Sequence, residues 1–182
     1  MPVNHTWGID LTTVTVGKKH KTILGIIDHG TRMNLSLTEL PSKHSMNILR
    51  ELSKTIRQYG VPRFIRTDNE RCFNAKIIRL ALKLLGIKHQ KSDIACPWQN
   101  GRIERFFGTF KEKVKQVIFT NPETFQTELN TFNIWYNHCR THEHIGGLTP
   151  KEMWLKRRDR NVTKAVWVND WNGILTGYYF PD

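Results

Sequence analysis

The first forty residues alternate between short apolar runs and polar turns. Apolar and β-branched side chains fill residues 7–13 and 22–28, and apolar positions alternate with polar ones over residues 33–37. Runs of this kind favour strands, and a period of two places alternate side chains on one buried face. The basic segment 17–20 and the His29–Gly30 pair have the composition of turns. The pattern predicts three antiparallel strands joined by short connections.

Beyond residue 40 the pattern changes to helices that alternate with short strands. Apolar residues recur at helical spacing from about residue 42 to 59, where Gly60 follows, and again over residues 77–85. Compact apolar segments at residues 63–67 and 87–90 are strand candidates. Residues 92–101 contain proline, asparagine and glycine without any period, which is typical of a loop.

The last part of the chain is mainly helical. A long helix is expected from about Arg102, a second over residues 125–136, and a short one at residues 149–152. The buried stripe of the long helix is predicted to be Ile103, Phe107, Phe110, Val114 and Val117. Beyond residue 164 the pattern leaves two interpretations open, a strand pair or the beginning of a domain that is cut off at Asp182.

The order of these elements predicts an α/β fold with a five-stranded mixed sheet and helices on both faces. With 182 residues and 21.4 kDa, the chain fits one compact domain and a short appendage. We assign residues 1–155 to the core and residues 156–182 to a C-terminal extension, either complete or the start of a truncated domain.

The composition narrows the class of protein. Lys and Arg number 28 against 16 Asp and Glu, a formal charge of +12, and apolar residues reach 38%, enough to bury a core. No apolar run approaches the roughly 18 residues of a membrane span, and no secretory signal is recognisable. Three widely spaced cysteines are typical of reduced thiols. We exclude membrane proteins, secreted disulfide scaffolds and collagen-like fibres, whereas the charge alone fits nucleic acid, an anionic surface or simple solubility.

Three carboxylates stand at positions that can converge. Asp10 lies inside the first apolar strand, Asp68 directly follows the strand ending at Thr67, and Glu104 lies in the first turn of the long helix. Each alone has an ordinary interpretation, such as a turn residue or a charge at a helix N-terminus. Together they would repel one another unless a cation neutralised them. Oxygen ligands suit Mg²⁺ or Mn²⁺, so we predict a metal site at the sheet edge.

The neighbours of Glu104 extend this hypothesis toward phosphate. Gly108, Lys111 and Lys115 share roughly one helix face with Glu104, and the lysines could neutralise DNA phosphates. The alternative is a solvated basic face. The preceding loop carries aromatic, amide and guanidinium groups that could stack on or wedge between bases, namely Trp98, Gln99, Asn100 and Arg102.

Three motifs in this order match a known family. They are TDNERCF at residues 67–73, PWQNGRIERFFGTFK at residues 97–111, and WYNHCRTH at residues 135–142, followed by GLTPKE at residues 147–152. Asp68 and Glu104 are separated by 35 residues. From about Trp7 to Trp154, the chain resembles the integrase core of bacterial insertion-sequence transposases and retroviral integrases.

The resemblance implies an RNase H-like fold and a DDE triad of Asp10, Asp68 and Glu104 that holds two Mg²⁺ ions when DNA is bound. Such a core nicks transposon ends and transfers the freed strand into target DNA, without a covalent protein–DNA intermediate. By the same analogy Asn69, Asn100 and Lys111 lie beside the metals or contact DNA. It further implies a homodimer or DNA-induced multimer, and a cytoplasmic, nucleoid-associated bacterial protein without membrane partners.

Two other functions stay open from the sequence. One is an RNase H-like nuclease that acts on RNA–DNA hybrids or branched DNA. The other is a non-catalytic DNA-binding or assembly module derived from a transposase, which loss of a triad carboxylate would favour. Transposases of this type usually carry an N-terminal helix-turn-helix region, and this chain begins a few residues before its first strand. We therefore expect recognition of transposon ends to need a further region.

Overall fold

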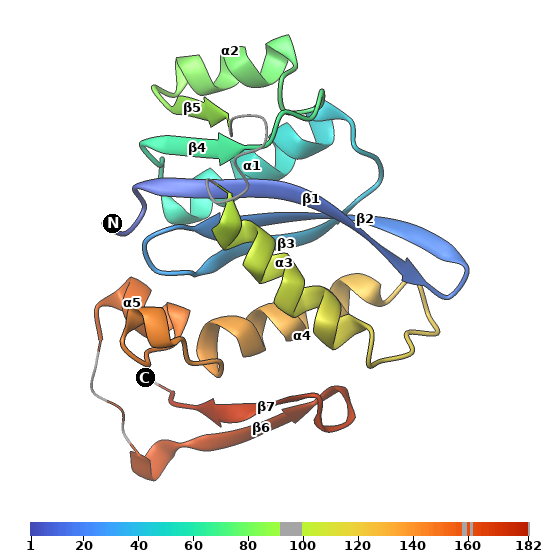
Figure 1. Ribbon diagram of the computed structural model, residues 1–182, viewed down its shortest axis with the longest axis vertical. Helices are drawn as coiled ribbons and strands as arrows, with labels where there is room; N and C mark the ends of the chain where they lie inside the picture. Colours follow the sequence, from blue (N-terminus) through green and yellow to red (C-terminus); the bar gives the residue numbers. More distant parts are fainter. Residues whose placement is uncertain (92–99, 158–159, 161, 182) are drawn as a thin grey trace.

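The computed structural model describes residues 1–91, 100–157, 160 and 162–181. Its main sheet has five strands in the order β3-β2-β1-β4-β5 (Figure 1). β1, β2 and β3 are antiparallel, whereas β4 and β5 run parallel to β1. The bounds of the strands are Thr6–Val16 for β1, Lys19–Asp28 for β2, Asn34–Leu40 for β3, Phe64–Thr67 for β4 and Lys88–Lys91 for β5. The predicted mixed sheet is confirmed.

Helices cover both faces of this sheet, as predicted. α1 and α2 pack on one face, and α3 and α4 on the other, where Figure 1 shows α3 crossing in front of the strands. The bounds of the helices are Ser45–Tyr59 for α1, Lys76–Leu84 for α2, Gly101–Val114 for α3, Phe125–His138 for α4 and Pro150–Leu155 for α5. Within the described part of the chain, no helix combines the length and the apolar character that crossing a bilayer requires.

The period of two in β1 decides which side chains meet which helices. Trp7, Ile9 and Leu11 lie in the core shared with α1 and α2, whereas Val14 and Val16 lie in the core shared with α3 and α4. An even-numbered residue of this strand therefore belongs to the α3 side. Asp10 is such a residue, and the strand thus aims it toward α3.

A glycine lets α3 lie close to the sheet at this point. Gly25 of β2 pairs with Asp10. A Cβ atom at Gly25 would lie 2.7 Å from Cζ of Phe107 and 3.4 Å from Cδ1 of Ile103, both on α3. The absent side chain allows the first turns of α3 to settle beside the strand that carries Asp10.

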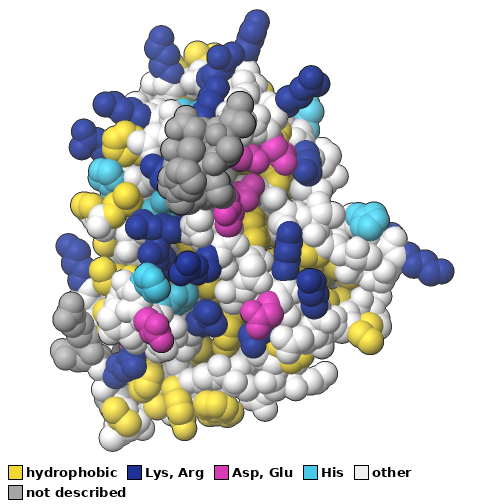
Figure 2. Space-filling view, viewed as in Figure 1, with side chains coloured by type: hydrophobic (Ala, Val, Ile, Leu, Met, Phe, Trp, Pro, Cys, Tyr) yellow, Lys and Arg dark blue, Asp and Glu magenta, His cyan; other side chains and the backbone are white. Residues whose placement is uncertain are grey.

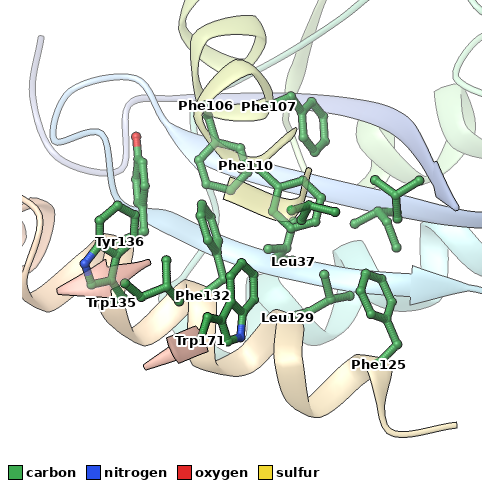
Figure 3. Packing of buried hydrophobic residues seen from close by; sticks show 14 of the residues in the cluster. Leu37, Phe106, Phe107, Phe110, Phe125, Leu129, Phe132, Trp135, Tyr136 and Trp171 are labelled. Carbon is green, nitrogen blue, oxygen red and sulfur yellow. The ribbon is translucent and has the colours of Figure 1, made fainter. Parts of the chain in front are cut away.

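Aromatic side chains fill the space between α3 and α4 (Figure 3). Phe106 meets Tyr136 edge-on at 4.8 Å between ring centroids, and Phe110 meets Phe132 edge-on at 5.1 Å. Edge-to-face pairs of this kind stabilise a core beyond the burial of their area. Trp171 from the C-terminal segment joins them and donates from Nε1 to Glu128 at 2.8 Å.

Of the two interpretations left open for the C-terminal segment, the structure shows the strand pair. β6 (Val166–Asp170) and β7 (Leu175–Tyr179) form an antiparallel pair of their own. The pair packs on α4, where Trp135 donates from Nε1 to the carbonyl oxygen of Thr176 at 2.9 Å, and Leu175 is fully buried. The division between residues 1–155 and 156–182 stays a prediction.

Two local expectations were wrong. β3 was expected to be half-buried, yet Asn34 and Ser36 are buried as well. Helices on both faces explain this, because Asn34 bonds to Asn137 of α4 and Ser36 donates to Glu51 of α1 at 2.7 Å. The basic segment 17–20 was expected to be a turn, but β2 already begins at Lys19. Lys19 and His20 are exposed and pair with Val16 and Thr15 of β1, so the start of β2 has no hydrophobic signal in the sequence.

Candidate functional site

The first carboxylate of the site, Asp10, lies in the middle of β1 and is half-buried. Its Oδ1 accepts a hydrogen bond from the backbone N–H of Leu11 at 2.7 Å. Burial, and to a lesser extent the nearby carboxylates of Asp68, Glu70 and Glu104, raise the pKa of Asp10 to about 7 against the lowering effect of the Leu11 hydrogen bond. A carboxyl group in these surroundings is stabilised by an added cation.

The second carboxylate, Asp68, comes directly after β4. Gly8 of β1 pairs with Arg66 of β4, and the two strands are parallel. Asp10 and Asp68 each follow two residues later, so they come level with each other. Oδ1 of Asp68 accepts from the backbone N–H of Glu70 at 3.0 Å, which fixes the turn. Burial raises the pKa of Asp68, and the Glu70 carboxylate raises it as well.

The third carboxylate, Glu104, is exposed in the first turn of α3. Its backbone N–H donates to the carbonyl oxygen of Asn100 at 3.2 Å, at the start of the helix. Ile103 is fully buried in the core on the α3 side of the sheet, which anchors this turn. Glu104 is therefore carried on a rigid element, while its side chain stays open to solvent.

In the structure Asp10 lies close enough to Asp68 and Glu104 for their carboxylates to act on it electrostatically. No group of three His, Cys, Asp or Glu side chains among the residues described is close enough to hold an ion by itself. Mg²⁺ usually binds through one or two carboxylates and completes its coordination with water and substrate phosphate. The oxygen-only donor set, with its mutual repulsion, therefore fits Mg²⁺ or Mn²⁺. Figure 2 shows acidic side chains gathered on the face that α3 crosses.

Sequence reasoning gave no role to a fourth carboxylate, Glu70. It lies near enough to Asp10 and Asp68 to raise the pKa of both. Oε1 of Glu70 is 3.4 Å from Nζ of Lys43, and Oε2 accepts from the thiol of Cys72 at 3.5 Å. The signal was its place two residues after Asp68, within the first of the three motifs.

The other predicted residues divide into three groups. Lys111 and Lys115 are exposed along α3 and its end, and Asn69 is exposed beside Asp68. Asn100 is buried, and its carbonyl oxygen accepts from the first amides of α3. Arg102 donates to the carbonyl oxygen of His29, away from the carboxylates. The last group, Trp98 and Gln99, lies outside the described residues.

Comparisons with known proteins show which proteins the chain is similar to. Residues 85–150 match the family model of the integrase core domain. Two curated relatives are 24% identical to this chain: the insertion element IS476 uncharacterized 39.2 kDa protein of Xanthomonas euvesicatoria and the insertion element IS407 uncharacterized 31.7 kDa protein of Burkholderia multivorans. The alignments cover 90% and 85% of this chain but 48% and 57% of those proteins. The chain thus spans about half the length of these relatives.

Solved structures share the fold. The HTLV-2 integrase catalytic core domain, solved in complex with magnesium, superposes with a TM-score of 0.69 at 20% identity over 84% of this chain and 97% of that chain. A chain of the simian T-cell lymphotropic virus intasome in complex with PP2A regulatory subunit B56 gamma superposes with a TM-score of 0.71 at 20% identity, over 98% of this chain and 67% of that chain. The family match over residues 85–150 supports the resemblance found in the sequence, and the chain shares the RNase H-like fold of these catalytic cores.

Proposed function

We propose that this chain is the catalytic core of a DDE transposase or integrase, which nicks DNA and transfers strands with the help of divalent metal ions. The observation that carries this proposal is the convergence of Asp10, Asp68 and Glu104 from β1, from the end of β4 and from the start of α3. The pKa of Asp10 is raised mainly by burial and in addition by the carboxylates of Asp68, Glu70 and Glu104, so an added cation would stabilise this group.

Asp10, Asp68 and Glu104 would hold Mg²⁺ or Mn²⁺, two ions when DNA is bound. When bound, such ions would supply Lewis-acid chemistry, namely activation of the attacking oxygen and stabilisation of the leaving oxygen. The HTLV-2 core was solved with magnesium, which supports the same choice of metal here.

The chain itself supplies orientation and charge. Backbone N–H groups of Leu11 and Glu70 hold the carboxylates of Asp10 and Asp68 in fixed orientations. Lys111 and Lys115 on α3 are exposed and free to bind phosphates that flank the cut. Because the attacking oxygen comes from water or from a DNA 3′-hydroxyl, the mechanism uses no serine or tyrosine nucleophile.

The partners in this proposal are transposon ends and target DNA. Joining two ends requires at least two active sites, so the working form is a homodimer or a DNA-induced multimer. Regions beyond this chain would read the ends, since both relatives extend beyond the part that matches this chain. The proposed setting is the nucleoid in the bacterial cytoplasm.

The two alternatives have less support. The match to the integrase core domain extends through residue 150 and includes the motif of residues 135–142, which favours strand transfer over an RNase H-like nuclease. All three carboxylates are present, which disfavours a non-catalytic module.

The test is nicking and strand transfer on labelled duplex DNA with Mg²⁺ or Mn²⁺, comparing the protein with Glu104→Gln. Glu112→Gln is the matched control, because Glu112 is an exposed carboxylate two turns further along α3. We expect activity in the protein and the control and none with Glu104→Gln. Equal activity in both variants would refute the triad. DNA binding without turnover in every protein, with Mg²⁺ present, would favour the assembly module.

A further inference from the structure

A cavity of about 580 Å³ opens beside α3, on a different face from Glu104. Arg102, Arg105 and Thr109 line it at helical spacing, whereas Glu104 does not. Arg32 from the β2–β3 turn and Arg140 from the segment after α4 complete the wall. Four arginines thus come together from three distant parts of the chain.

A buried amide joins two of these parts. The side chain of Asn137 on α4 accepts from the backbone N–H of Asn34 at 2.9 Å and donates to its carbonyl oxygen at 2.8 Å. Asn34 is two residues after Arg32, and Asn137 is three residues before Arg140. This double hydrogen bond fixes the segment that carries Arg32 relative to the segment that carries Arg140, so that both arginines line the same cavity.

The positive charge in the cavity is only partly compensated by the protein, since Asp28 lies near enough to Arg32 and Arg102 to favour their charged forms. Across the described ranges, no ion pair links any of the four arginines to a carboxylate, and Glu143 is the one acidic residue that lines the cavity. Burial lowers the pKa of Arg32, and Arg102 lowers it further. Burial also lowers the pKa of His142 to about 4, with Arg140 and Arg32 adding to the effect. Cations crowded in this way are stabilised by an added anion.

Two polar atoms of the cavity wall are buried without a partner. Nε of Arg140 and Nε2 of His142 form no hydrogen bond with any residue that the structure describes. Aromatic rings hold both side chains in place, since Arg140 lies 5.7 Å from the ring centroid of Trp135 and His142 lies edge-on to Tyr136 at 5.1 Å. A buried polar atom without a partner is costly, so its place in a fixed wall points to a ligand.

The cavity continues into a second one of about 350 Å³. Arg32, Arg102 and His144 line both, and His29 and Met153 line the second alone. We call the two together the basic groove. Figure 2 shows dark blue and cyan side chains gathered on the same face as the acidic ones. An extended groove with guanidinium groups along it matches a chain of phosphates better than a single free anion.

We propose that the basic groove binds the sugar–phosphate backbone of a DNA strand that runs on from the catalytic carboxylates. The proposal rests on the proposed function, because the carboxylates give the strand its starting point. Glu104 and Arg105 are adjacent in the first turns of α3, so a strand that crosses the start of this helix meets the metal site on one side and the groove on the other.

The experiment is duplex DNA binding over a series of salt concentrations, with Arg105→Gln, Arg140→Gln and the control Arg57→Gln. Arg57 is exposed on α1, which packs on the other face of the sheet. We expect each groove variant to weaken binding roughly threefold or more and to lower the salt slope by about one, as the loss of one phosphate contact does. Arg105 is exposed, so Arg105→Gln keeps the test valid even if Arg140→Gln disturbs folding.

The outcomes separate this proposal from the proposed function. Groove variants that bind like Arg57→Gln would overturn the groove, whatever the activity, and would leave an acidic protein partner as its occupant. Weakened groove variants in a protein that shows no metal-dependent nicking would support the groove and refute the catalytic proposal. Competition by inorganic phosphate, compared with chloride at equal ionic strength, distinguishes the DNA backbone from free phosphate as the ligand of the basic groove. If phosphate competes saturably with DNA and Arg140→Gln abolishes this competition, the groove binds a free anion and the proposal of a DNA strand is refuted.

Discussion

The two sides of the first turns of α3 differ in the sign of their crowded charges. On one side the carboxylates of Asp68, Glu70 and Glu104 raise the pKa of Asp10, and that of Glu70 raises the pKa of Asp68, on top of the effect of burial. On the other side the cationic groups around Arg32 and His142 lower the pKa of their neighbours. Both regions keep like charges together at a cost in stability, as ligand sites commonly do. The acidic side fits a divalent cation and the basic side fits a phosphate backbone, and one helix joins the two.

The largest expected effect is on the acidic side. Asp10→Asn removes a metal ligand and should lower metal-dependent strand transfer by more than about 100-fold. In the absence of metal the same change relieves repulsion, while the amide oxygen can still accept from Leu11. We expect the Tm without metal to rise by about 2–4 °C, the response of a chain of this size to roughly 1 kcal/mol. Calorimetry without and with Mg²⁺ checks both signs, and a lower Tm without metal would contradict the repulsion.

The next largest effect is expected where α3, which separates the acidic side from the basic side, packs against Gly25 of the sheet. Gly25→Ala puts a Cβ atom 2.7 Å from the Phe107 ring and should lower the free energy of unfolding by about 1–3 kcal/mol as α3 is pushed from the sheet. Gly108→Ala is the control, because a Cβ atom there meets nothing within 4 Å. It should stabilise α3 by up to about 1 kcal/mol. Urea unfolding measures both changes, and equal stabilities would show that Gly25 does not set the approach of α3.

The basic side predicts a dependence of stability on pH. The pKa of His142 is about 4 in the folded protein, below its ordinary value of about 6.5, because of burial and the nearby arginines. Between these values the unfolded state binds the proton first, so the folded state loses stability as the pH falls from about 6.5 toward 4. The loss should reach up to about 1.4 kcal/mol per pH unit for this group.

Urea unfolding between pH 7 and 4 measures this slope, with His142→Gln for comparison. The variant should lose less stability than the protein itself over the same interval. Bound DNA should flatten the slope in the protein, since phosphate in the basic groove favours the charged imidazole. Identical slopes in the protein and the variant would show that His142 is not held neutral by its surroundings.

The smallest expected effect comes from the one carboxylate of the groove wall. Glu143→Gln removes the negative charge that opposes phosphate binding and should strengthen duplex binding about twofold, as rim charges change affinity modestly. A fluorescence titration at low salt resolves a change of this size. Weaker binding in this variant would indicate that Glu143 positions a groove arginine instead of opposing the DNA.

The residues of the acidic side could be predicted from the sequence better than those of the basic side, for physical reasons. Asp10 stood out because a carboxylate inside an apolar strand is unfavourable, and Asp68 and Glu104 stood at the ends of elements whose order was readable. Arg32 and Arg140 lie in connecting segments, where charge has no periodic signature. Contacts between β3 and α4, far apart in the sequence, bring them together, among them the double hydrogen bond of Asn34 and Asn137.

Hydrophobic patterning likewise defined the sheet and its helices better than their exposed ends. The apolar period gave the central strands and the faces of α1 to α4, because burial leaves a pattern in the sequence. At the end of the first hairpin, Lys19 and His20 of β2 are exposed, and their backbone pairing with β1 leaves no such pattern, although Val14 and Val16 of β1 are buried.

The central claim is that adjacent residues of α3 serve different ligands. The most direct test measures kcat and KM for strand transfer, together with DNA affinity, for Glu104→Gln and Arg105→Gln. We expect Glu104→Gln to bind duplex DNA as tightly as the unchanged protein but to have no measurable kcat. We expect Arg105→Gln to retain its kcat and to have a higher KM for DNA. A normal kcat in Glu104→Gln, or a loss of kcat without a change in KM in Arg105→Gln, would contradict it.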